Sequence, residues 1–502
     1  MKFLFSALLA LSTLVTLGQD EYEVKLKKDP KKNLTKYKAV LGSDSKGNVF
    51  NYTAKKGRSL QVVDSKKLTV KAEILLEAEL KSKGYKIYDI DFKGDFLFAY
   101  AYKKSGSDLY LFTLDHNLNF IGGNPVIGNF NDCVNVSHRT NKNDYHRYNL
   151  LNFVHSFYDE NTKEYFFIVN NTCKNSGRLS LNCTVFDEKI KKKSNFQLRP
   201  AVYGAFKSLH YYNVNGLKFL SVQLTEKKAL ASYLFAFNEE GQMDEIKINL
   251  PKPYLPMEHV VTRSRSNETI VHGLAINSAS SKIDGVFQGK IRAGDDELME
   301  VKVFDMFAFF KEKGMTLGDI EYRGLTTKAL SLNYQVIDYL QNKDGSMTLI
   351  FQNRYDYYYE RTRNRCFKNF LLINIDNDHL NWVHFLPGGK CILNDNFTSD
   401  IHMIYKDEIY ILQDITLKDE KITRGEYRGE KAIQIEWNRF VYKITPNGEL
   451  EFRKINDEKT DGEFGFAEAV FLPNEKTILF IDMDASAMTG VSKKIKYYIL
   501  DL

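Results

Sequence analysis

The chain lacks the short motifs that mark the common catalytic sites. It has no H-E-x-x-H, no G-x-S-x-G nucleophile elbow, no G-x-x-x-x-G-K-[ST] phosphate loop and no glycine-rich dinucleotide fingerprint. The Asp-box pattern of sialidase-like propellers is missing as well. A catalytic pair of carboxylates assembled from distant parts of the chain would leave no local pattern. We expect no cofactor and no resident metal, and the sequence favours a protein that is not an enzyme.

Long apolar runs are confined to the first residues. Met1 and Lys2 precede the apolar segment Phe3–Leu17, and small residues lie just before Gln19, which is the pattern of a secretory signal peptide over residues 1–18. No later segment reaches ~18 consecutive apolar residues, so we expect no integral membrane segment after signal removal. The net charge is only +6 for 502 residues, which gives no indication of nucleic-acid binding. We predict an exported protein that is secreted, periplasmic or associated with the cell envelope.

Cysteine is scarce, with five residues in the chain. Export permits disulfides. Cys173 and Cys183 flank the turn signal 174–177, and Cys366 and Cys391 lie near the ends of successive strands, so each pair can form a bridge. Cys133 would remain unpaired. Connectivity does not follow from sequence, and cysteine also serves as a small apolar residue, so free thiols are the alternative.

Apolar runs followed by a polar turn recur along the chain. Such runs are Asp108–Asp115, Tyr233–Asn238, Phe370–Asp376 and Phe440–Thr445. Many of them are apolar at consecutive positions, where a half-exposed sheet would alternate. Inner strands of a propeller blade are covered on both faces by the neighbouring blades, which explains this pattern.

The turn after the third strand of each unit gives the repeat its period. These turns fall at Asp64, Asp115, Asp187, Asn238, Asp295, Asp376 and Pro446, a mean interval of roughly 64 residues. Typical propeller repeats span ~40–50 residues, so long inserted loops are expected. We predict an all-β protein with one β-propeller of about seven (six to eight) four-stranded blades over residues 36–502, after a lead-in over 19–35. A β-sandwich is the alternative, but it does not explain so many comparable units.

One short inserted helix is predicted over Val303–Lys313, ended by Gly314. Phe304, Phe307 and Phe310 have helical spacing within it. It would lie between the fifth and sixth units. We also expect the ring to close by pairing Lys36–Leu41 with Ile495–Leu500, because closure removes an exposed sheet edge.

Several segments carry a resemblance to a known group. They are Glu79–Phe92 followed by Phe96–Tyr102 and Leu109–Phe112, then Leu274–Phe287, and the Tyr-rich hairpin Arg354–Tyr359 leading into Asn369–Val383. In blade order and pattern, over most of the mature chain, this resembles uncharacterised exported proteins of Bacteroidetes. The resemblance implies a secreted propeller-like β fold and transfers no activity, substrate or site residue. Cys366 and Cys391 around the hairpin depart from that group.

The most unusual candidate surface is the segment Arg354–Arg365, which interleaves tyrosine with arginine. These two residue types concentrate binding energy at interfaces, and they also stack on sugar rings or bind acidic groups. We predict ligand contacts from Tyr355, Tyr357, Tyr359, Arg361, Arg363 and Arg365. The alternative is a long hairpin whose tyrosines pack on an adjacent blade while its arginines are solvated.

Two further segments have partial metal-binding patterns. Cys133, His138, Asp144 and His146 share one loop, but their spacing matches no zinc motif. Asp89 and Asp91 begin a partial calcium-loop pattern in which Lys93 replaces a ligand. A polar insertion and a strand with its turn explain these segments equally well, so we predict no metal site.

Two functions remain in competition. The favoured hypothesis is an exported, non-catalytic β-propeller, monomeric, that binds a protein, peptide or glycan through loops on one face. The alternative is a hydrolase whose carboxylates or histidines converge at the central channel. Three or more acidic, histidine or arginine side chains directed into one pocket would favour the hydrolase, whereas an apolar or plugged channel would favour the binding protein.

Overall fold

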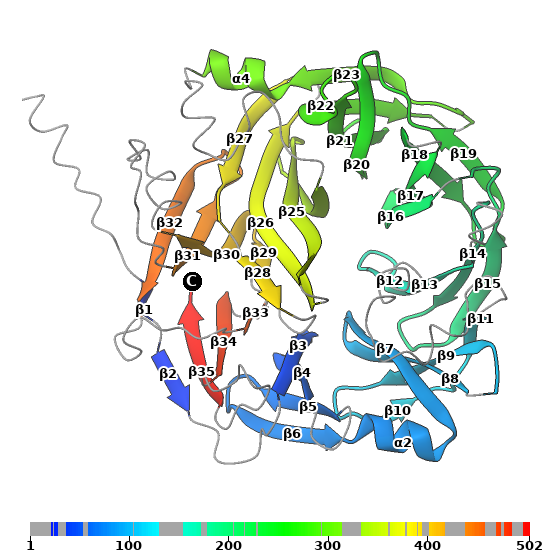
Figure 1. The fold of residues 1–502 in the computed structure, drawn as a ribbon, viewed down its shortest axis with the longest axis vertical. Helices are drawn as coiled ribbons and strands as arrows, with labels where there is room; N and C mark the ends of the chain where they lie inside the picture. The colour runs from blue at the N-terminus through cyan, green and yellow to red at the C-terminus, as the bar shows by residue number, and fades with distance from the viewer. Residues whose placement is uncertain are drawn as a thin grey trace, which may run out of the picture.

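The computed structural model is an eight-bladed β-propeller (Figure 1). Its described residues form eight sheets of four or five strands. Their strands pair antiparallel, except that Tyr22–Glu23 pairs parallel with Ile455 and Asn456. The predicted all-β propeller of six to eight blades is therefore confirmed, and the number of blades is eight. The structure describes residues 22–23, 25–28, 37–53, 59–103, 105–129, 154–171, 178–203, 205–214, 216–226, 229–292, 294–313, 333–359, 362–376, 379–388, 390–393, 401–416, 437–456, 468–472, 476–483 and 495–502.

The first four blades follow one another without interruption in the chain. Blade 1 contains β3 (Tyr37–Ser43), β4 (Asn48–Thr53), β5 (Ser59–Asp64) and β6 (Thr69–Ile74). Blade 2 contains β7 (Tyr85–Lys93), β8 (Phe96–Lys103), β9 (Asp108–Leu114), β10 (Phe120–Ile121) and β11 (Val126–Asn129). Blade 3 contains β12 (Val154–Asp159), β13 (Glu164–Asn170), β14 (Leu181–Phe186) and β15 (Lys192–Leu198). Blade 4 contains β16 (Ala205–Val214), β17 (Leu217–Glu226), β18 (Ala229–Phe237) and β19 (Met243–Lys247).

The last four blades include the two that the N-terminal segment completes. Blade 5 contains β20 (Tyr254–Arg263), β21 (Thr269–Asn277), β22 (Lys282–Ile291) and β23 (Met299–Asp305). Blade 6 contains β24 (Tyr334–Gln341), β25 (Met347–Tyr359), β26 (Thr362–Ile375), β27 (Leu380–Leu386) and β28 (Lys390–Leu393). Blade 7 contains β29 (Ile401–Tyr405), β30 (Glu408–Thr416), β31 (Trp437–Ile444), β32 (Leu450–Asn456) and β1 (Tyr22–Glu23). Blade 8 contains β33 (Glu468–Leu472), β34 (Thr477–Met483), β35 (Ile495–Asp501) and β2 (Lys25–Lys28).

The strand that closes the ring differs from the predicted one. β2 (Lys25–Lys28) pairs antiparallel with β35 and supplies the fourth strand of blade 8. β3, which contains the described part of the predicted closing strand Lys36–Leu41, instead pairs with β4 as the first strand of blade 1. Lys36 itself lies outside the described residues. The chain thus closes through its two ends, as expected, but one strand earlier (Figure 1).

The first strand of each blade lies nearest the propeller axis. Neighbouring first strands contact one another, as β3 with β7, β16 with β20, and β3 with β33 across the closure. Since the strands alternate in direction, turns between first and second strands and between third and fourth strands lie on one side, which we name the turn face. The opposite side, the loop face, receives the connections between second and third strands and between successive blades.

Side-chain caps fix the tight turns that define the repeat. Asp115 Oδ1 accepts hydrogen bonds from the backbone N–H groups of Asn117 (2.8 Å) and Asn119 (2.9 Å). Asp187 and Asn238 make the same pair of contacts after the third strands of blades 3 and 4. Asp and Asn favour such turns because the short side chain replaces a backbone acceptor. The predicted turn positions are confirmed at these blades.

Aromatic side chains between the blades form much of the core. Phe98 of blade 2 meets Phe167 of blade 3 edge to face, with ring centroids 5.0 Å apart. Phe166 of blade 3 stacks on Phe237 of blade 4 at 5.5 Å. The second strands β8 and β13 are buried at successive positions, over Phe98–Tyr102 and Tyr165–Val169, because a neighbouring blade covers each side. This is the pattern seen in the sequence.

Two short helices are present in the described residues. α4 (Met306–Glu312) begins at Asp305, whose carboxylate caps the N–H groups of Phe307 and Ala308. It occupies the predicted place between blades 5 and 6, although residues 303–305 belong to β23. α2 (Leu76–Ser82) was not predicted, and it buries Leu76 and Leu80 between blades 1 and 2. Neither helix is long and apolar enough to cross a membrane.

Candidate functional site

Bulges in the first strands bring polar side chains to the propeller axis. The pairing of β7, β16, β20 and β24 with their second strands shifts register at residues 87–89, 206–208, 256–259 and 336–338. A bulge redirects the side chains beside it. Three side-chain pairs then join neighbouring blades, and we name them the axial pairs: Asp91–Ser156, His210–Glu258 and Asp338–His402.

Glu258 is the most connected of these residues. Its carboxylate, 4% exposed, accepts hydrogen bonds from His210 Nε2 (3.0 Å) and Ser208 Oγ (3.0 Å) of blade 4. The Val336 N–H of blade 6 approaches it at 3.4 Å. Burial alone would raise the pKa of the Glu258 carboxyl, but the hydrogen bonds and charge of His210 and the Ser208 hydrogen bond outweigh it, so that this pKa is lowered. Glu258 is therefore an anion that holds three blades together.

The other axial pairs repeat this arrangement at alternate blade interfaces. Asp338 of blade 6 lies 3.0 Å from His402 Nε2 of blade 7. Asp91 of blade 2 accepts a hydrogen bond from Ser156 of blade 3. Tyr339 packs near the axis with its ring 6.1 Å from that of Tyr212, and burial raises the pKa of Tyr339 to about 12. The carboxylates of all three axial pairs thus have a side-chain partner on a neighbouring blade.

A metal centre is not formed by these groups. Among the described residues, no three His, Cys, Asp or Glu side chains converge so that they could hold an ion. Asp89 and Asp91 belong to β7, and Asp91 is bonded to Ser156, so the partial calcium pattern is part of a strand. The loop with Cys133, His138, Asp144 and His146 lies outside the described residues.

Burial keeps the side chains of His259 and His272 neutral. Burial lowers the pKa of His259 to about 4 and that of His272 to about 3, from an ordinary value of 6.5. His259 Nδ1 faces the Met257 carbonyl at 3.3 Å, so this nitrogen donates and Nε2 accepts from Ser221 Oγ at 2.7 Å. His272 Nδ1 is buried and has no hydrogen-bond partner within the described residues.

These histidines make stability depend on pH. In the unfolded chain they bind protons near pH 6.5, whereas in the folded protein they do so only near pH 4 and pH 3. The unfolded state therefore binds more protons in this range, and stability falls as pH falls. As pH falls from about 7.5 to about 5, each buried histidine should lower the free energy of unfolding by about 2 kcal/mol. Urea unfolding of the His272→Leu variant should show a shallower pH dependence than the parent, and an equal slope would contradict this assignment.

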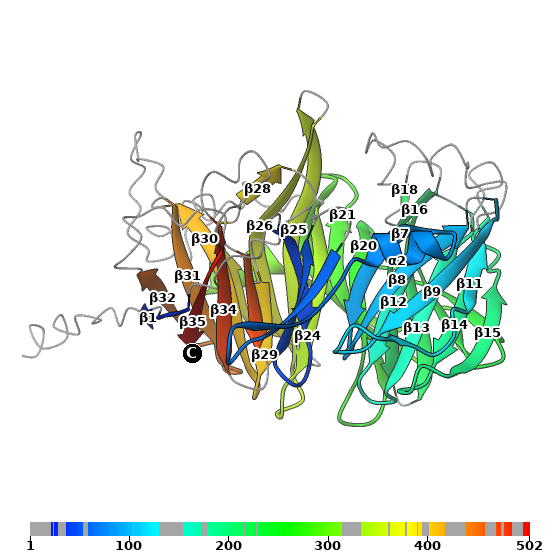
Figure 2. The same ribbon diagram turned by 90° about the horizontal axis from the view of Figure 1, so that it is seen from below.

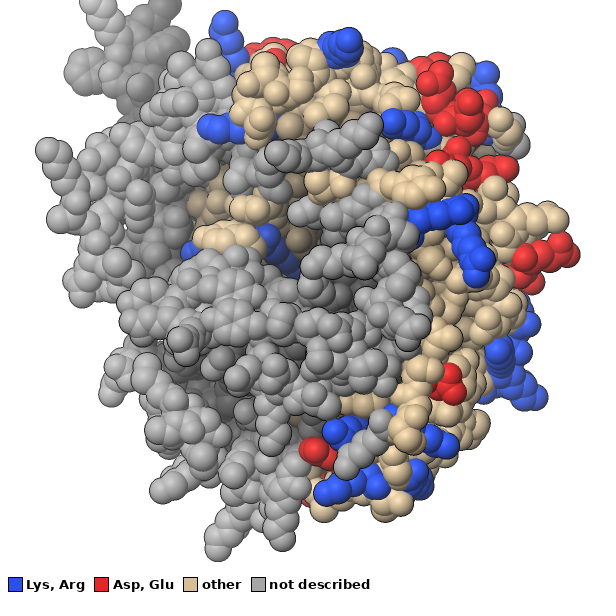
Figure 3. Space-filling model, turned by 45° about the vertical axis from the view of Figure 1, so that its right-hand side comes forward, with Lys and Arg blue, Asp and Glu red and all other residues tan. Residues whose placement is uncertain are grey.

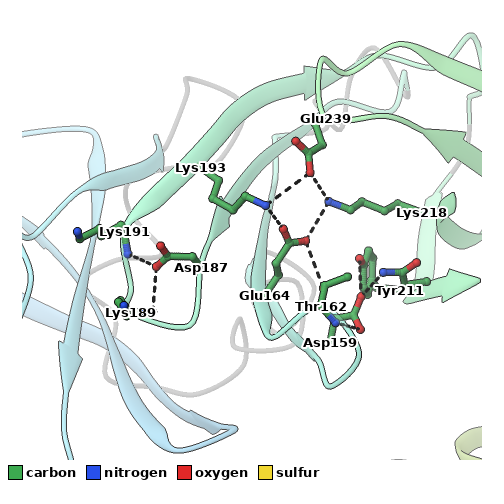
Figure 4. Close-up of polar contacts among 11 residues, drawn as sticks. Asp159, Thr162, Glu164, Asp187, Lys189, Lys191, Lys193, Tyr211, Lys218 and Glu239 are labelled. Atoms are coloured by element: carbon green, nitrogen blue, oxygen red, sulfur yellow. Dashed lines mark hydrogen bonds and ion pairs between the residues drawn. The ribbon is translucent and has the colours of Figure 1, made fainter. Parts of the chain in front are cut away.

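An ion-pair network joins blades 3 and 4 on the turn face (Figure 4). The carboxylate of Glu164 binds Lys218 Nζ at 3.0 Å and also pairs with Lys193. Lys218 also approaches Glu239 at 3.4 Å. Burial alone would raise the pKa of Glu164, but the two lysines together lower it. The side chains of Glu164 and Lys218 are only 7% and 8% exposed, whereas that of Lys193 is 41% exposed.

Glu164 and Lys193 should contribute unequally to stability. Replacing Glu164 with Ala leaves the Lys218 charge buried with a single exposed partner, so we expect a loss of about 3 kcal/mol. Replacing Lys193 with Ala removes an exposed pair and should cost less than about 1 kcal/mol. Chemical unfolding of both variants measures the difference. Equal losses of unfolding free energy in the two variants would show that the buried Glu164–Lys218 pair contributes no more than the Glu164–Lys193 pair.

The predicted Tyr/Arg segment forms the tip of the longest hairpin. β25 pairs with β24 only through Asn353, and β26 pairs with β27 only from Phe370 onwards. Beyond those points β25 and β26 pair with each other, and β28 supports the β26 side at Asn364–Phe367. Figure 2 shows this hairpin projecting on the loop face beyond the other blades. The register places Tyr355 opposite Cys366, Tyr357 opposite Asn364 and Tyr359 opposite Thr362, with Asp356 opposite Arg365 and Tyr358 opposite Arg363.

The hairpin brings five of the six predicted contact residues onto two paired strands. Tyr355, Tyr357 and Tyr359 belong to β25, and Arg363 and Arg365 belong to β26. Arg361 lies outside the described residues. Arg354, at the base, donates from Nε to Gln352 Oε1 at 2.7 Å. Successive strand positions alternate between faces, so the register places Tyr355, Tyr357 and Tyr359 on one face of the hairpin and the positions of Arg363 and Arg365 on the other. The predicted residues therefore share one hairpin on the loop face, but they do not form a single surface.

The disulfide prediction for Cys183 is wrong. Cys183 is a free thiol, fully buried in β14 between Ile168 of β13 and Phe196 of β15. Burial raises its pKa. It acts as a small apolar core residue, so it is not available to Cys173, which lies outside the described residues.

Charges of both signs alternate over the surface. On the face that Figure 3 shows, the Lys and Arg side chains of the described residues are interspersed with Asp and Glu side chains. Neither sign forms a continuous field there, which agrees with the small net charge of +6.

Sequence reasoning did not find the axial pairs. Glu258 and His210 are 48 positions apart, and Asp338 and His402 are 64 apart. Their meeting depends on the blade repeat and on bulges that have no residue signature. The hairpin, in contrast, is local, and its composition alone indicated it.

Comparison with known proteins does not identify a function for this chain. No family model and no curated protein matches the sequence. Among solved structures, the chain is similar to the polysaccharide lyase Uly1, with 9% identity over 95% of this chain and 99% of that one and a TM-score of 0.37. It is also similar to the β-propeller domain of the Trilobed protease from Pyrococcus furiosus, with 10% identity over 84% and 99% and a TM-score of 0.36. For an α-L-arabinanase of Penicillium chrysogenum the identity is 8% over 70% and 92%, with a TM-score of 0.33. Likenesses of this degree carry no argument about activity.

Proposed function

We propose that the protein is an exported, non-catalytic β-propeller that binds a protein, peptide or glycan through its loop face. The observation that carries the proposal is the β25–β26 hairpin, whose strands of 13 and 14 residues extend past their blade. A projecting two-stranded element presents side chains to a ligand without rearrangement of the core. Its tyrosine and arginine content is typical of binding hot spots.

The polar groups near the axis support binding over hydrolysis. A retaining or inverting hydrolase needs one carboxyl that can give up a proton and one that can act as base or nucleophile. Glu258 has a lowered pKa and accepts hydrogen bonds from two side chains, so it is held as an anion. Asp338 is paired with His402. These groups hold blades together, which explains their polarity without catalysis.

The export prediction is part of this proposal. The signal peptide predicted for residues 1–18 lies outside the described residues. Secretion of the full chain fused to a reporter, compared with a chain that lacks residues 1–18, tests it directly.

Alanine substitution of the hairpin tests the binding proposal. The mature protein would be immobilised and exposed to envelope and medium extracts, and its captured ligand quantified. We expect Tyr355→Ala, Tyr357→Ala and Tyr359→Ala together to reduce capture at least about tenfold, as loss of a hot spot does. The control is Glu188→Ala with Lys189→Ala in a turn-face loop, which should capture the ligand normally. Undiminished capture by the folded hairpin variant would contradict the proposal.

The hydrolase alternative rests on the axial His–carboxylate pairs. If the protein cleaved polysaccharides or peptides from the same extracts, and Asp338→Asn changed the pH profile of that cleavage, the alternative would replace the binding proposal. Asp338 is suitable because its side chain is 40% exposed, so its replacement should not unfold the blade.

We also propose a disulfide between Cys366 and Cys391. The two residues are direct Cα partners in the pairing of β26 with β28. A bond there would fasten β28 to the base of the projecting hairpin. Unreduced proteolytic digests of the exported protein should contain the linked pair of peptides. Recovery of both residues as free thiols would contradict the proposal.

A further inference from the structure

A polar cavity of about 260 Å³ lies between blades 5 and 6 on the turn face. This volume is just below the roughly 300–1,000 Å³ of sites for drug-sized ligands, so it suits a smaller molecule. Its walls come from the β20–β21 turn, the β24–β25 turn and the β26–β27 turn. The cavity and the β25–β26 hairpin lie on opposite faces of the propeller, so they are separate candidate sites.

Small residues leave room for the cavity at the β20–β21 and β24–β25 turns. Ser264, Gly345 and Ser346 line it. Between blades 2 and 3, Tyr165 lies against Gly94 in the turn between the first and second strands. Between blades 6 and 7, Trp382 lies against Gly448 further from the axis, in the turn between the third and fourth strands of blade 7. Between blades 3 and 4 the ion-pair network around Glu164 occupies the interface. Large or paired side chains thus fill these other interfaces.

Two arginines are held at the rim of the cavity. Arg265 donates from Nη2 to the Lys343 carbonyl at 2.6 Å and lies over Gly345, where any Cβ would overlap it. Gly345 has φ +87°, which also favours glycine. The Arg263 carbonyl accepts from Gln341 Nε2 at 2.5 Å, which fixes the backbone at Arg263. Both arginines are exposed and line the cavity.

A network of hydroxyl and amide groups forms the opposite wall. Asp344 Oδ1 accepts from the backbone N–H of Ser346 (2.8 Å) and from its hydroxyl (2.6 Å). These hydrogen bonds, with the charge of Arg265, lower the pKa of Asp344. Asn374 donates to the Ser346 hydroxyl at 3.2 Å, and Asn381 donates to Asn374 at 2.6 Å. The wall is therefore pre-organised, and it offers both donors and acceptors.

The charge balance identifies the class of ligand. Arg263 and Arg265 are matched by Asp344 and Asp376, and His379 Nδ1 lies 3.2 Å from the Asp376 carboxylate. With the His379 ring neutral, the cavity has no excess charge to select an anion or a cation. His272 also lines it and stays neutral. Alternating donors and acceptors around a small neutral cavity match the hydroxyl groups of a sugar ring. We infer that this cavity binds one neutral sugar residue.

The test uses neutral methyl glycosides as probes. Saturation-transfer NMR and titration calorimetry of the mature protein with methyl hexosides and methyl pentosides should detect at least one of them binding. Arg263→Ala and Asn381→Ala should each weaken that binding about tenfold or more, since each removes a hydrogen-bonding group from the cavity. The matched control is Lys343→Ala, because only the backbone of Lys343 takes part, and it should leave binding unchanged.

The outcomes separate this inference from the proposed function. The triple tyrosine variant of the hairpin should bind the glycoside normally, because the two sites lie on opposite faces. Binding of inorganic phosphate or a uronic acid in preference to every neutral glycoside would overturn the inference. So would the absence of glycoside binding, or glycoside binding that Arg263→Ala and Asn381→Ala both leave intact.

Discussion

Removal of residues 495–502 should destabilise the whole propeller by about 5 kcal/mol or more. The deleted segment contains β35, which pairs along its length with β34 and also with β2. It buries Ile499 and Leu500, and each buried aliphatic side chain contributes about 1.5–3 kcal/mol. Its loss also separates β2 from the ring and exposes a sheet edge. Differential scanning calorimetry of the truncated and parent proteins measures the effect.

A chain that lacks residues 22–28 is the matched comparison. It loses β1 and β2, which are outermost strands, while β35 keeps its pairing with β34. We expect this deletion to cost less than the C-terminal truncation and to leave one cooperative transition. A C-terminal truncation that unfolds at the parent temperature would refute the closed ring.

The substitution Glu258→Ala should cost about 3–5 kcal/mol of unfolding free energy. Such losses follow the removal of one partner from a buried, hydrogen-bonded charge pair. His210 and Ser208 would both lose their acceptor at the interface of blades 4 and 5. Because the pKa of Glu258 is lowered in the folded state, its contribution is complete above the unfolded pKa and is lost as pH falls through the folded pKa.

Glu188→Ala is the control for this substitution, since Glu188 is exposed in the β14–β15 turn. Its change should be within about 0.5 kcal/mol. Urea unfolding at neutral pH measures both variants. If Glu258→Ala were as stable as Glu188→Ala, the axial pairs would not be structural, and a catalytic role for them would become the better explanation.

Local features of the fold could be predicted because their causes are local. An Asp or Asn that caps a turn needs only the next few residues, as at Asp115 and Asp187. The helix was predicted from the spacing of Phe304, Phe307 and Phe310, and α4 does form there. Phe304 belongs to β23 instead, and the helix buries Met306 and Phe310. The composition of the hairpin likewise does not depend on the rest of the chain.

Features that depend on closure could not be predicted in this way. Blade 8 takes its fourth strand from Lys25–Lys28, so no turn joins its third strand β35 to its fourth. A count of such turns therefore gives seven units for eight blades. The short strand β2 has the sequence KLKK, which has no strand pattern of its own. The axial pairs and the cavity between blades 5 and 6 similarly arise only when distant strands become neighbours.

Site-specific photo-crosslinking tests the loop-face proposal most directly. A photoreactive phenylalanine analogue would replace Tyr357 at the hairpin tip or, as a control, Lys189 on the turn face, and the mature protein would be irradiated with envelope and medium extracts. We expect a discrete adduct from position 357 that the unlabelled parent protein competes away, and none from position 189. An adduct formed equally from both positions, or from neither while the parent still captures a ligand, would contradict the account.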